Sequence, residues 1–280
     1  MTLIDWILNV TGVLLWLNFR SVKFDPLVRT SAASLAGTLR RAEPVTRSKW
    51  PFLAAIVGVI LFRGWFYSEL GPAVDWVPSL RLGAITIPFR SDYKDRVLLF
   101  SILSFGLALA VFYLWMLCLS LVNGRASETD PLQRFVRLHL GVVDGWPWPL
   151  RLLVPLNAGG AVWFGLHPVF AGLGVVPHAG STRVLLAQTC VMGLATYLSW
   201  KYVLGGLLAL YLLNSYVYLG SHPFWAFVTL TGGNVLAPLR KIPLCYGKVD
   251  FSPVLAIVLI FGISELVQVG LVHLYRLASA

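Results

Sequence analysis

Charged residues are scarce in this sequence of 280 residues: only 12% are Asp, Glu, Lys or Arg, whereas 58% are hydrophobic. An average soluble domain carries about 25% charged residues, so this chain lacks the polar surface that a soluble protein of its size needs. Disorder is excluded as well, because disordered chains are polar and poor in aromatic residues. The mean hydropathy of +0.77 is typical of a polytopic membrane protein.

Cysteine is equally scarce, with only Cys118, Cys190 and Cys245, and no two of them have the spacing of a metal site. We therefore expect neither a zinc site nor a disulfide framework. The first charge is Asp5, and no basic segment precedes the first apolar run, so we expect no cleaved signal peptide. The motifs of hydrolases, zinc proteases and nucleotide-binding enzymes are also missing. The chain is thus expected not to be an enzyme and to need no cofactor. No motif in the sequence indicates a small-molecule substrate.

Six long apolar stretches remain, and each is near the length of about 20 residues that crosses a bilayer as a helix. The predicted fold class is an all-α polytopic membrane protein with about six transmembrane helices. The fifth stretch is too long for one perpendicular span, so it is either one tilted helix or two spans hinged near Lys201. No turn signal divides it, and we expect one long helix. The stretches are Leu3–Phe19, Trp50–Tyr67, Val97–Val122, Leu152–Val176, Val184–Leu219 and Pro253–Tyr275.

The basic residues are distributed unevenly among the loops between these stretches. Loops 20–49, 123–151 and 220–252 share one side of a six-span topology and hold 14 Lys and Arg, against 6 on the opposite side. The positive-inside rule predicts that these three loops are cytoplasmic and that both termini are extracytoplasmic. The net charge of +10 then indicates contact with anionic lipids of the bilayer rather than with nucleic acid.

Each of the three basic loops begins with a similar dipeptide, Asp25-Pro26, Asp130-Pro131 or His222-Pro223. An amphipathic stretch with helical spacing follows in each, and such a helix lies naturally in the headgroup plane of a membrane. The chain therefore reads as about three degenerate units of span, cytoplasmic interfacial helix and span. The interfacial helices are expected at 26–41, 131–143 and 223–236, and the units at 1–67, 97–176 and 177–280, with an extracytoplasmic connector at 68–96.

The last unit resembles the YggT family (also called YlmG-like) of small membrane proteins. Three elements carry the resemblance: a dipeptide motif after the first span, a basic turn between prolines, and a Gly…Asp-x-Ser-Pro entry to the second span. The matching residues are His222, Pro223 and Phe224, then Pro238, Arg240, Lys241 and Pro243, then Gly247, Asp250, Ser252 and Pro253. The middle and first units match less of the pattern.

The resemblance implies a multi-pass protein of the bacterial cytoplasmic membrane without established enzymatic activity. Bacterial relatives are associated with cell division, envelope organisation and osmotic tolerance, and chloroplast relatives with haem attachment to cytochrome b6 and nucleoid distribution. Partner membrane proteins are therefore possible. From the residues themselves, either Asp250 or Ser252 is expected to cap the N-terminus of the last span, with Pro253 in its first turn.

Three charges fall inside the predicted spans, namely Arg63, Lys201 and Glu265. Such charges are costly in lipid and mark candidate sites. Arg63 follows Pro51, and Glu265 follows Pro253, by the same number of residues, so we expect Glu265 to pair with either Arg63 or Lys201. Two function classes follow: an organising protein that binds lipid and membrane partners, or a component of a transporter or channel that uses these charges.

Overall fold

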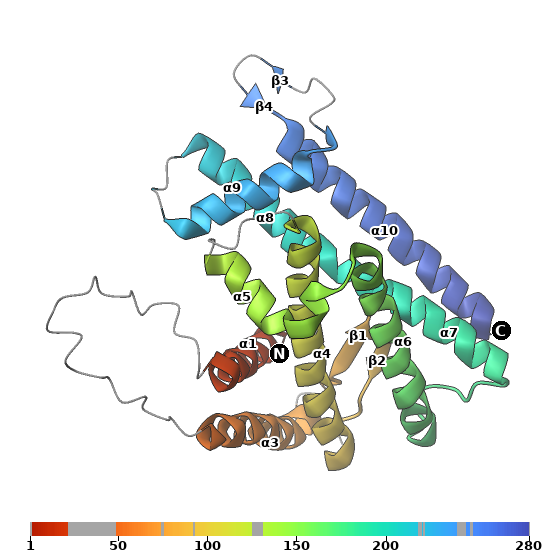
Figure 1. Ribbon diagram of the computed structural model, residues 1–280. Helices are drawn as coiled ribbons and strands as arrows, with labels where there is room; N and C mark the ends of the chain where they lie inside the picture. Colours follow the sequence, from red (N-terminus) through yellow and green to blue (C-terminus); the bar gives the residue numbers. More distant parts are fainter. Residues whose placement is uncertain are drawn as a thin grey trace, which may run out of the picture. The chain divides into compact units, whose positions relative to one another are not determined.

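The computed structural model describes most of the chain and divides it into two compact units, which are considered separately. Unit 1 comprises residues 1–78 and 89–109, and unit 2 comprises residues 79–88 and 110–280. Figure 1 gives the element labels used below. The described residues are 2–21, 49–73, 76–91, 93–124, 131–217, 220, 222–239, 245–246 and 249–279.

Unit 1 is built from α1 (Thr2–Ser21), α3 (Trp50–Ala73) and the first part of α4 (Lys94–Val122). Helix α1 packs along α3. An aromatic core lies at one end of the unit, where the Tyr67 and Trp76 ring centroids are 4.6 Å apart. Trp76 also contacts Phe100 edge to face at 6.5 Å. These rings bury a large apolar area and hold the segment after α3 against α4.

Unit 2 contains the rest of α4 and the remaining helices, and α10 packs along both α7 and α8. Figure 1 shows α7 and α8 following one another alongside α10. Helix α6 packs closely on α7, and α9 packs on α8. The bounds are α5 (Pro131–Leu140), η1 (Gly141–Gly145), α6 (Trp148–Gly172), α7 (Thr182–Ala195), η2 (Thr196–Ser199), α8 (Trp200–Tyr216), α9 (Pro223–Leu236) and α10 (Ser252–Ser279).

Five helical stretches in the described part of the chain are long and apolar enough to cross a membrane, which agrees with an all-α membrane protein. They are Trp50–Ala73, Lys94–Val122, Trp148–Gly172, Thr182–Tyr216 and Ser252–Ala278. The predicted first span forms helix α1 but is not among the five. Its polar residues Asp5, Asn9 and Asn18 lower its hydropathy.

The fifth predicted stretch is one continuous helical segment of 35 residues, as the sequence predicts. A short 3-10 turn, η2, interrupts its α-helical hydrogen bonding between α7 and α8. Irregular backbone at membrane depth is tolerated where protein groups satisfy it. Here the Thr196 hydroxyl donates to Gly193 O, and the indole of Trp115 donates to Ser199 O at 3.0 Å. The segment therefore changes its pitch without leaving these carbonyls unpaired.

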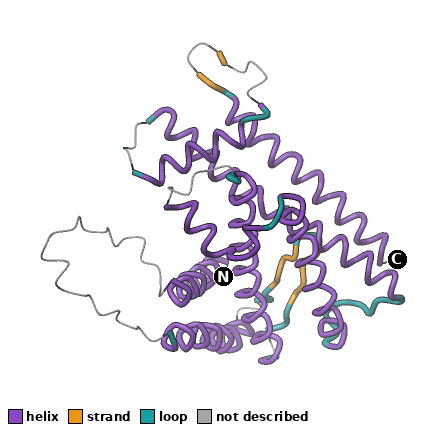
Figure 2. Tube along the Cα trace, viewed as in Figure 1, coloured by secondary structure: helices purple, strands orange, loops and turns teal. Residues whose placement is uncertain are grey.

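Two short antiparallel hairpins are features that the sequence did not predict (orange in Figure 2). Strands β1 (Ser79–Leu82) and β2 (Ile85–Pro88) pair within the predicted connector 68–96, and β3 (Cys245–Tyr246) pairs with β4 (Val249–Asp250). The first hairpin turns at Gly83, whose φ of 59° favours glycine. A Cβ at Gly83 would lie 2.5 Å from the Ala195 side chain at the end of α7. The tip of the hairpin thus contacts the middle of the long helical segment.

Helices α5 and α9 form where the sequence predicts the second and third interfacial helices, and the predicted helix at 26–41 lies outside the described residues. Their most buried apolar side chains pack into a shared protein core. Val136 of α5 and Phe227 of α9 contact Leu119 of α4 and Leu207 of α8. This part of each apolar stripe is therefore covered by protein, whereas Leu138 and Leu230 remain exposed.

Candidate functional site

An ion pair joins α8 to α10 in unit 2. The Lys201 Nζ donates a hydrogen bond of 2.6 Å to the Glu265 Oε1. Of the two partners that the sequence offers for Glu265, the structure brings Lys201 to it. The contact lies where α10 runs along α8, and close helix packing beside it depends on Gly205, whose built Cβ would meet the Phe261 ring at 2.5 Å.

The short turn η2 places Lys201 at the beginning of α8. Tyr197 in this turn donates from its hydroxyl to the carbonyl of Leu152 in α6. The Ser199 hydroxyl donates to Thr196 O at 2.8 Å, so the turn is held internally as well. These bonds attach the backbone just before Lys201 to a neighbouring helix. They restrict where its ammonium group can reach.

The two partners differ strongly in exposure. The Lys201 side chain is 5% exposed, whereas that of Glu265 is 62% exposed. Lys201 is enclosed by protein and has the Tyr202 ring 5.4 Å from its Nζ. A buried ammonium without a counter-charge is costly, so Glu265 is what permits Lys201 at this depth. The carboxylate itself faces largely away from unit 2.

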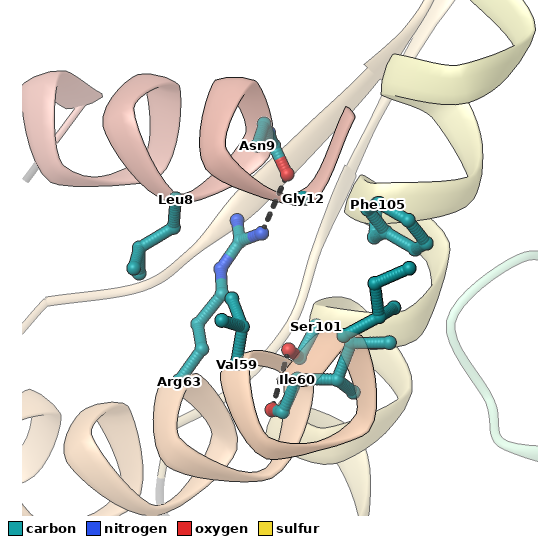
Figure 3. A pocket seen from close by; sticks show the side chains of 9 residues that line it. Leu8, Asn9, Gly12, Val59, Ile60, Arg63, Ser101 and Phe105 are labelled. Carbon is teal, nitrogen blue, oxygen red and sulfur yellow. Dashed lines mark hydrogen bonds between the residues drawn. The ribbon is translucent and has the colours of Figure 1, made fainter. Parts of the chain in front are cut away.

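A second charge cluster lies in unit 1 and is centred on Arg63 of α3, which is 2% exposed. Its Nη2 donates to Asp5 Oδ1 at 2.5 Å and to Ser104 Oγ at 2.9 Å. Its Nη1 donates to Asn9 Oδ1 at 2.9 Å, as Figure 3 shows. One guanidinium therefore connects α1, α3 and α4 through three different polar side chains, a use to which its planar fork of donors is well suited.

Other polar side chains of this cluster also bond to one another. The Tyr67 hydroxyl donates to Asp5 Oδ1 at 2.7 Å, and the Asn9 amide donates to Ser104 Oγ at 3.1 Å. The Phe100 ring centroid lies 4.9 Å from the Arg63 Cζ, a cation–π distance. The sequence offered Arg63 as one of two candidate partners of Glu265, but the structure gives it a different carboxylate, Asp5. Two of the three polar residues that lower the hydropathy of α1, Asp5 and Asn9, therefore accept hydrogen bonds from Arg63.

A small cavity adjoins Arg63 between α1, α3 and α4 (Figure 3). Its volume of about 10 Å³ is near the minimum for one water molecule. The lining is mostly apolar and includes Gly12, Ile56 and Phe105, while Asn9 and Ser101 contribute polar atoms. Ser101 already donates to Ile60 O at 2.8 Å. The cavity has no room for an organic substrate.

A third polar cluster, which the sequence did not reveal, joins η1, α4, α5 and α6. Asp144 accepts a hydrogen bond from the Ser120 hydroxyl and lies 3.5 Å from Arg137 Nε and 3.7 Å from Arg151 Nη1. Arg151 Nη1 also donates to Ser120 Oγ at 2.8 Å. The two arginines had been read only as parts of basic loops. No local signal linked them to Asp144, because the cluster forms only when α5 and α6 fold back onto α4.

The family-motif residues that the structure describes act at helix ends. His222 Nδ1 accepts from the Phe224 backbone N–H at 3.2 Å, and Pro223 begins α9. Asp250 Oδ1 accepts from the Ser252 N–H at 2.8 Å, where α10 starts. Pro238 is the second residue after α9, and Pro253 lies in the first turn of α10. Four further motif residues lie outside the described residues, namely Arg240, Lys241, Pro243 and Gly247.

The described residues contain no group of three or more His, Cys, Asp or Glu arranged to hold a metal ion. The interactions observed in the three clusters are hydrogen bonds and ion pairs between helices. Comparison with known proteins finds no matching family model, no similar curated protein and no similar solved structure.

Proposed function

We propose that this protein is a non-enzymatic integral membrane protein that organises or scaffolds partner membrane proteins. The observation that carries the proposal is that Arg63 and Lys201 are both buried and both engaged with carboxylates. Each connects helices within its unit. Charges used in this way position transmembrane helices, whereas charges of a transport path line a cavity that water can enter.

In this proposal the chain crosses the bacterial cytoplasmic membrane six times. Helix α1 is the span that brings the total to six, although it is the first along the chain. The hydrogen bonds that Asp5 and Asn9 accept from Arg63 support its place in the bundle, because they pair the polar groups of α1 within the protein. Both termini are extracytoplasmic, and α5 and α9 lie at the cytoplasmic surface. The exposed Leu138 and Leu230, together with the basic loops, then contact anionic lipid.

We further infer membership of the YggT-like proteins from the motif of the last unit. The bonds made by His222 and Asp250 support it, since these two motif elements lie at the starts of α9 and α10. A family in which such motifs orient spans and interfacial helices fits an organising role. Envelope organisation, cell division and assembly of membrane complexes are the corresponding processes.

A component of a transporter or channel is the second candidate. The 3-10 turn beside Lys201 favours it, because broken helices at membrane depth are frequent where ions or substrates bind. The partly exposed Glu265 is the group that such a pathway would use.

Purification from native membranes and flux measurement in proteoliposomes test the two candidates together. The organising role predicts a stoichiometric complex with another membrane protein and no flux of protons or alkali cations above that of empty vesicles. Flux that is lost on Lys201→Met, with the folded yield unchanged, would instead establish the transport function.

A further inference from the structure

One carboxylate oxygen of Glu265 lacks a hydrogen-bond donor among the described residues. Glu265 lies about 20 Å from either end of α10 at 1.5 Å per residue, and therefore near the centre of a hydrocarbon core about 30 Å thick if α10 spans the membrane. Its Oε1 accepts from Lys201, whereas Oε2 has no hydrogen-bond partner among the described residues. A carboxylate oxygen that faces lipid without a donor is costly. The position therefore calls for a donor from outside unit 2.

Glu265 lies within a line of exposed small and β-branched residues on α10. Val258, Gly262 and Val269 flank it at spacings of four, three and four residues, and Val254 extends the line; these five residues are termed the α10 seam. This spacing is that of a helix–helix contact. A Cβ at Gly262 would meet nothing within 4 Å, so the backbone is open to close approach by another helix.

We propose that the α10 seam binds a transmembrane helix of another membrane protein, which donates a hydrogen bond to the free oxygen of Glu265. Lys201 already neutralises the carboxylate, so the donor is a neutral side chain such as Ser, Thr, Asn, Gln or Tyr. A second cation would leave a net positive charge in the hydrocarbon core. The inference rests on the proposed organising function and identifies its surface and the class of partner.

A second copy of this chain does not fit the seam. A symmetric contact across α10 places Glu265 opposite the Glu265 of the other copy, which brings two acceptors together and supplies no donor. An asymmetric contact between copies leaves an unsatisfied seam at the end of an open chain of subunits, and only a closed ring would avoid this. The complementary surface is therefore assigned to a different protein, and the crosslinking experiment distinguishes that protein from a second copy.

Photocrosslinking of the full-length protein in its native membranes tests the inference. The probe p-benzoylphenylalanine replaces Val269 in the seam, and a matched control replaces Val267, which is exposed but points about 160° away. We expect the probe at Val269 to form an adduct with one transmembrane peptide of another protein that carries a neutral donor side chain. The control is expected not to form this adduct.

Two glycine variants keep the test independent of the ion pair. Gly262→Leu blocks close approach at the seam, while Gly270→Leu is equally unhindered within the fold but points about 140° from Glu265. Loss of an interhelical hydrogen bond and its packing predicts that Gly262→Leu lowers the yield of the adduct about threefold to twentyfold. Gly270→Leu should leave the yield unchanged.

The inference is overturned if the probe at Val269 forms its adduct with a second copy, with another part of the same chain or with lipid alone. It is also overturned if both glycine variants lower the adduct yield equally. Co-purification of a partner that forms no adduct at Val269 rejects the seam but leaves the organising function standing. If no stable complex forms at all, both are rejected.

Discussion

Lys201 and Glu265 form a 2.6 Å ion pair in which the cation is buried and the anion is largely exposed. Removing the one residue should therefore change the free energy of unfolding by a different amount from removing the other. Removal of the glutamate strands a charge inside the protein, whereas removal of the lysine leaves a carboxylate that can reach other groups. This asymmetry leads to the first prediction.

Glu265→Leu should destabilise the folded protein, because Lys201 then lacks its counter-charge; we expect a cost of about 1–3 kcal/mol. Glu265→Gln should cost less, since its amide oxygen still accepts a hydrogen bond. Lys201→Met combined with Glu265→Leu should recover part of the loss. Equilibrium unfolding in detergent measures all three, and purely additive effects in the double variant would contradict the pairing.

Arg63→Met should be more damaging than any change at Glu265, because three side chains depend on the guanidinium. We expect a loss of about 3–5 kcal/mol in the free energy of unfolding. Arg63→Lys should rescue little, since a point charge cannot serve Asp5, Asn9 and Ser104 together. Asp5→Asn in the Arg63→Met background should cost less than in the wild type. An equal cost in both backgrounds would show that the two residues act independently.

Val136→Asp should lower the yield of folded protein, because Val136 is buried between α4, α8 and α9. A carboxylate in that core has no donor and costs several kcal/mol, on the order of the penalty for an uncompensated polar group. Val142→Asp is the matched control, because Val142 lies in the adjoining turn η1 and is 80% exposed. Fluorescence-detected size-exclusion chromatography compares the two yields, and similar yields would refute the packing of α5.

Gly193→Ala should weaken the contact between α6 and α7, because the added Cβ would strike the carbonyl oxygen of Leu156. Backbone atoms in packed helices shift only at a substantial cost in free energy, so we expect the free energy of unfolding to fall by about 1–3 kcal/mol. Gly165→Ala, in α6 with open space around its Cβ, should be neutral or stabilising by up to about 1 kcal/mol. Thermal unfolding of the two variants provides the comparison. Equal stability would mean that α6 and α7 are not in close contact.

The proposed topology predicts that single cysteines in place of Ser127 and Lys248 react only with reagents that enter the cytoplasm. A cysteine in place of Ser181 should react with an impermeant maleimide added outside intact cells. A background free of Cys118, Cys190 and Cys245 removes competing thiols. Labelling of position 127 or 248 from outside would reverse or break the six-span order.

The sequence by itself determined the elements that depend on local pattern. Long apolar runs form the helices α3, α4, α6 and α10, and the uninterrupted fifth run forms the helical segment Thr182–Tyr216, because length and hydropathy are properties of neighbouring residues. The amphipathic spacing likewise predicted α5 and α9. It also restricted the partner of Glu265 to two cations, since few charges lie within apolar runs.

Only the tertiary structure decided which groups meet. Asp5 bonds to Arg63 across 58 residues of sequence, and nothing near either residue encodes the other. The contact of Gly83 with Ala195 arises in the same way, from segments that meet after a long interval of sequence. The partners of Asp144 are nearer in sequence, but they meet only because η1 turns the chain between α5 and α6 and brings it beside α4. Hydrogen-bond geometry is settled only when those helices pack, which is why Lys201, and not Arg63, bonds to Glu265.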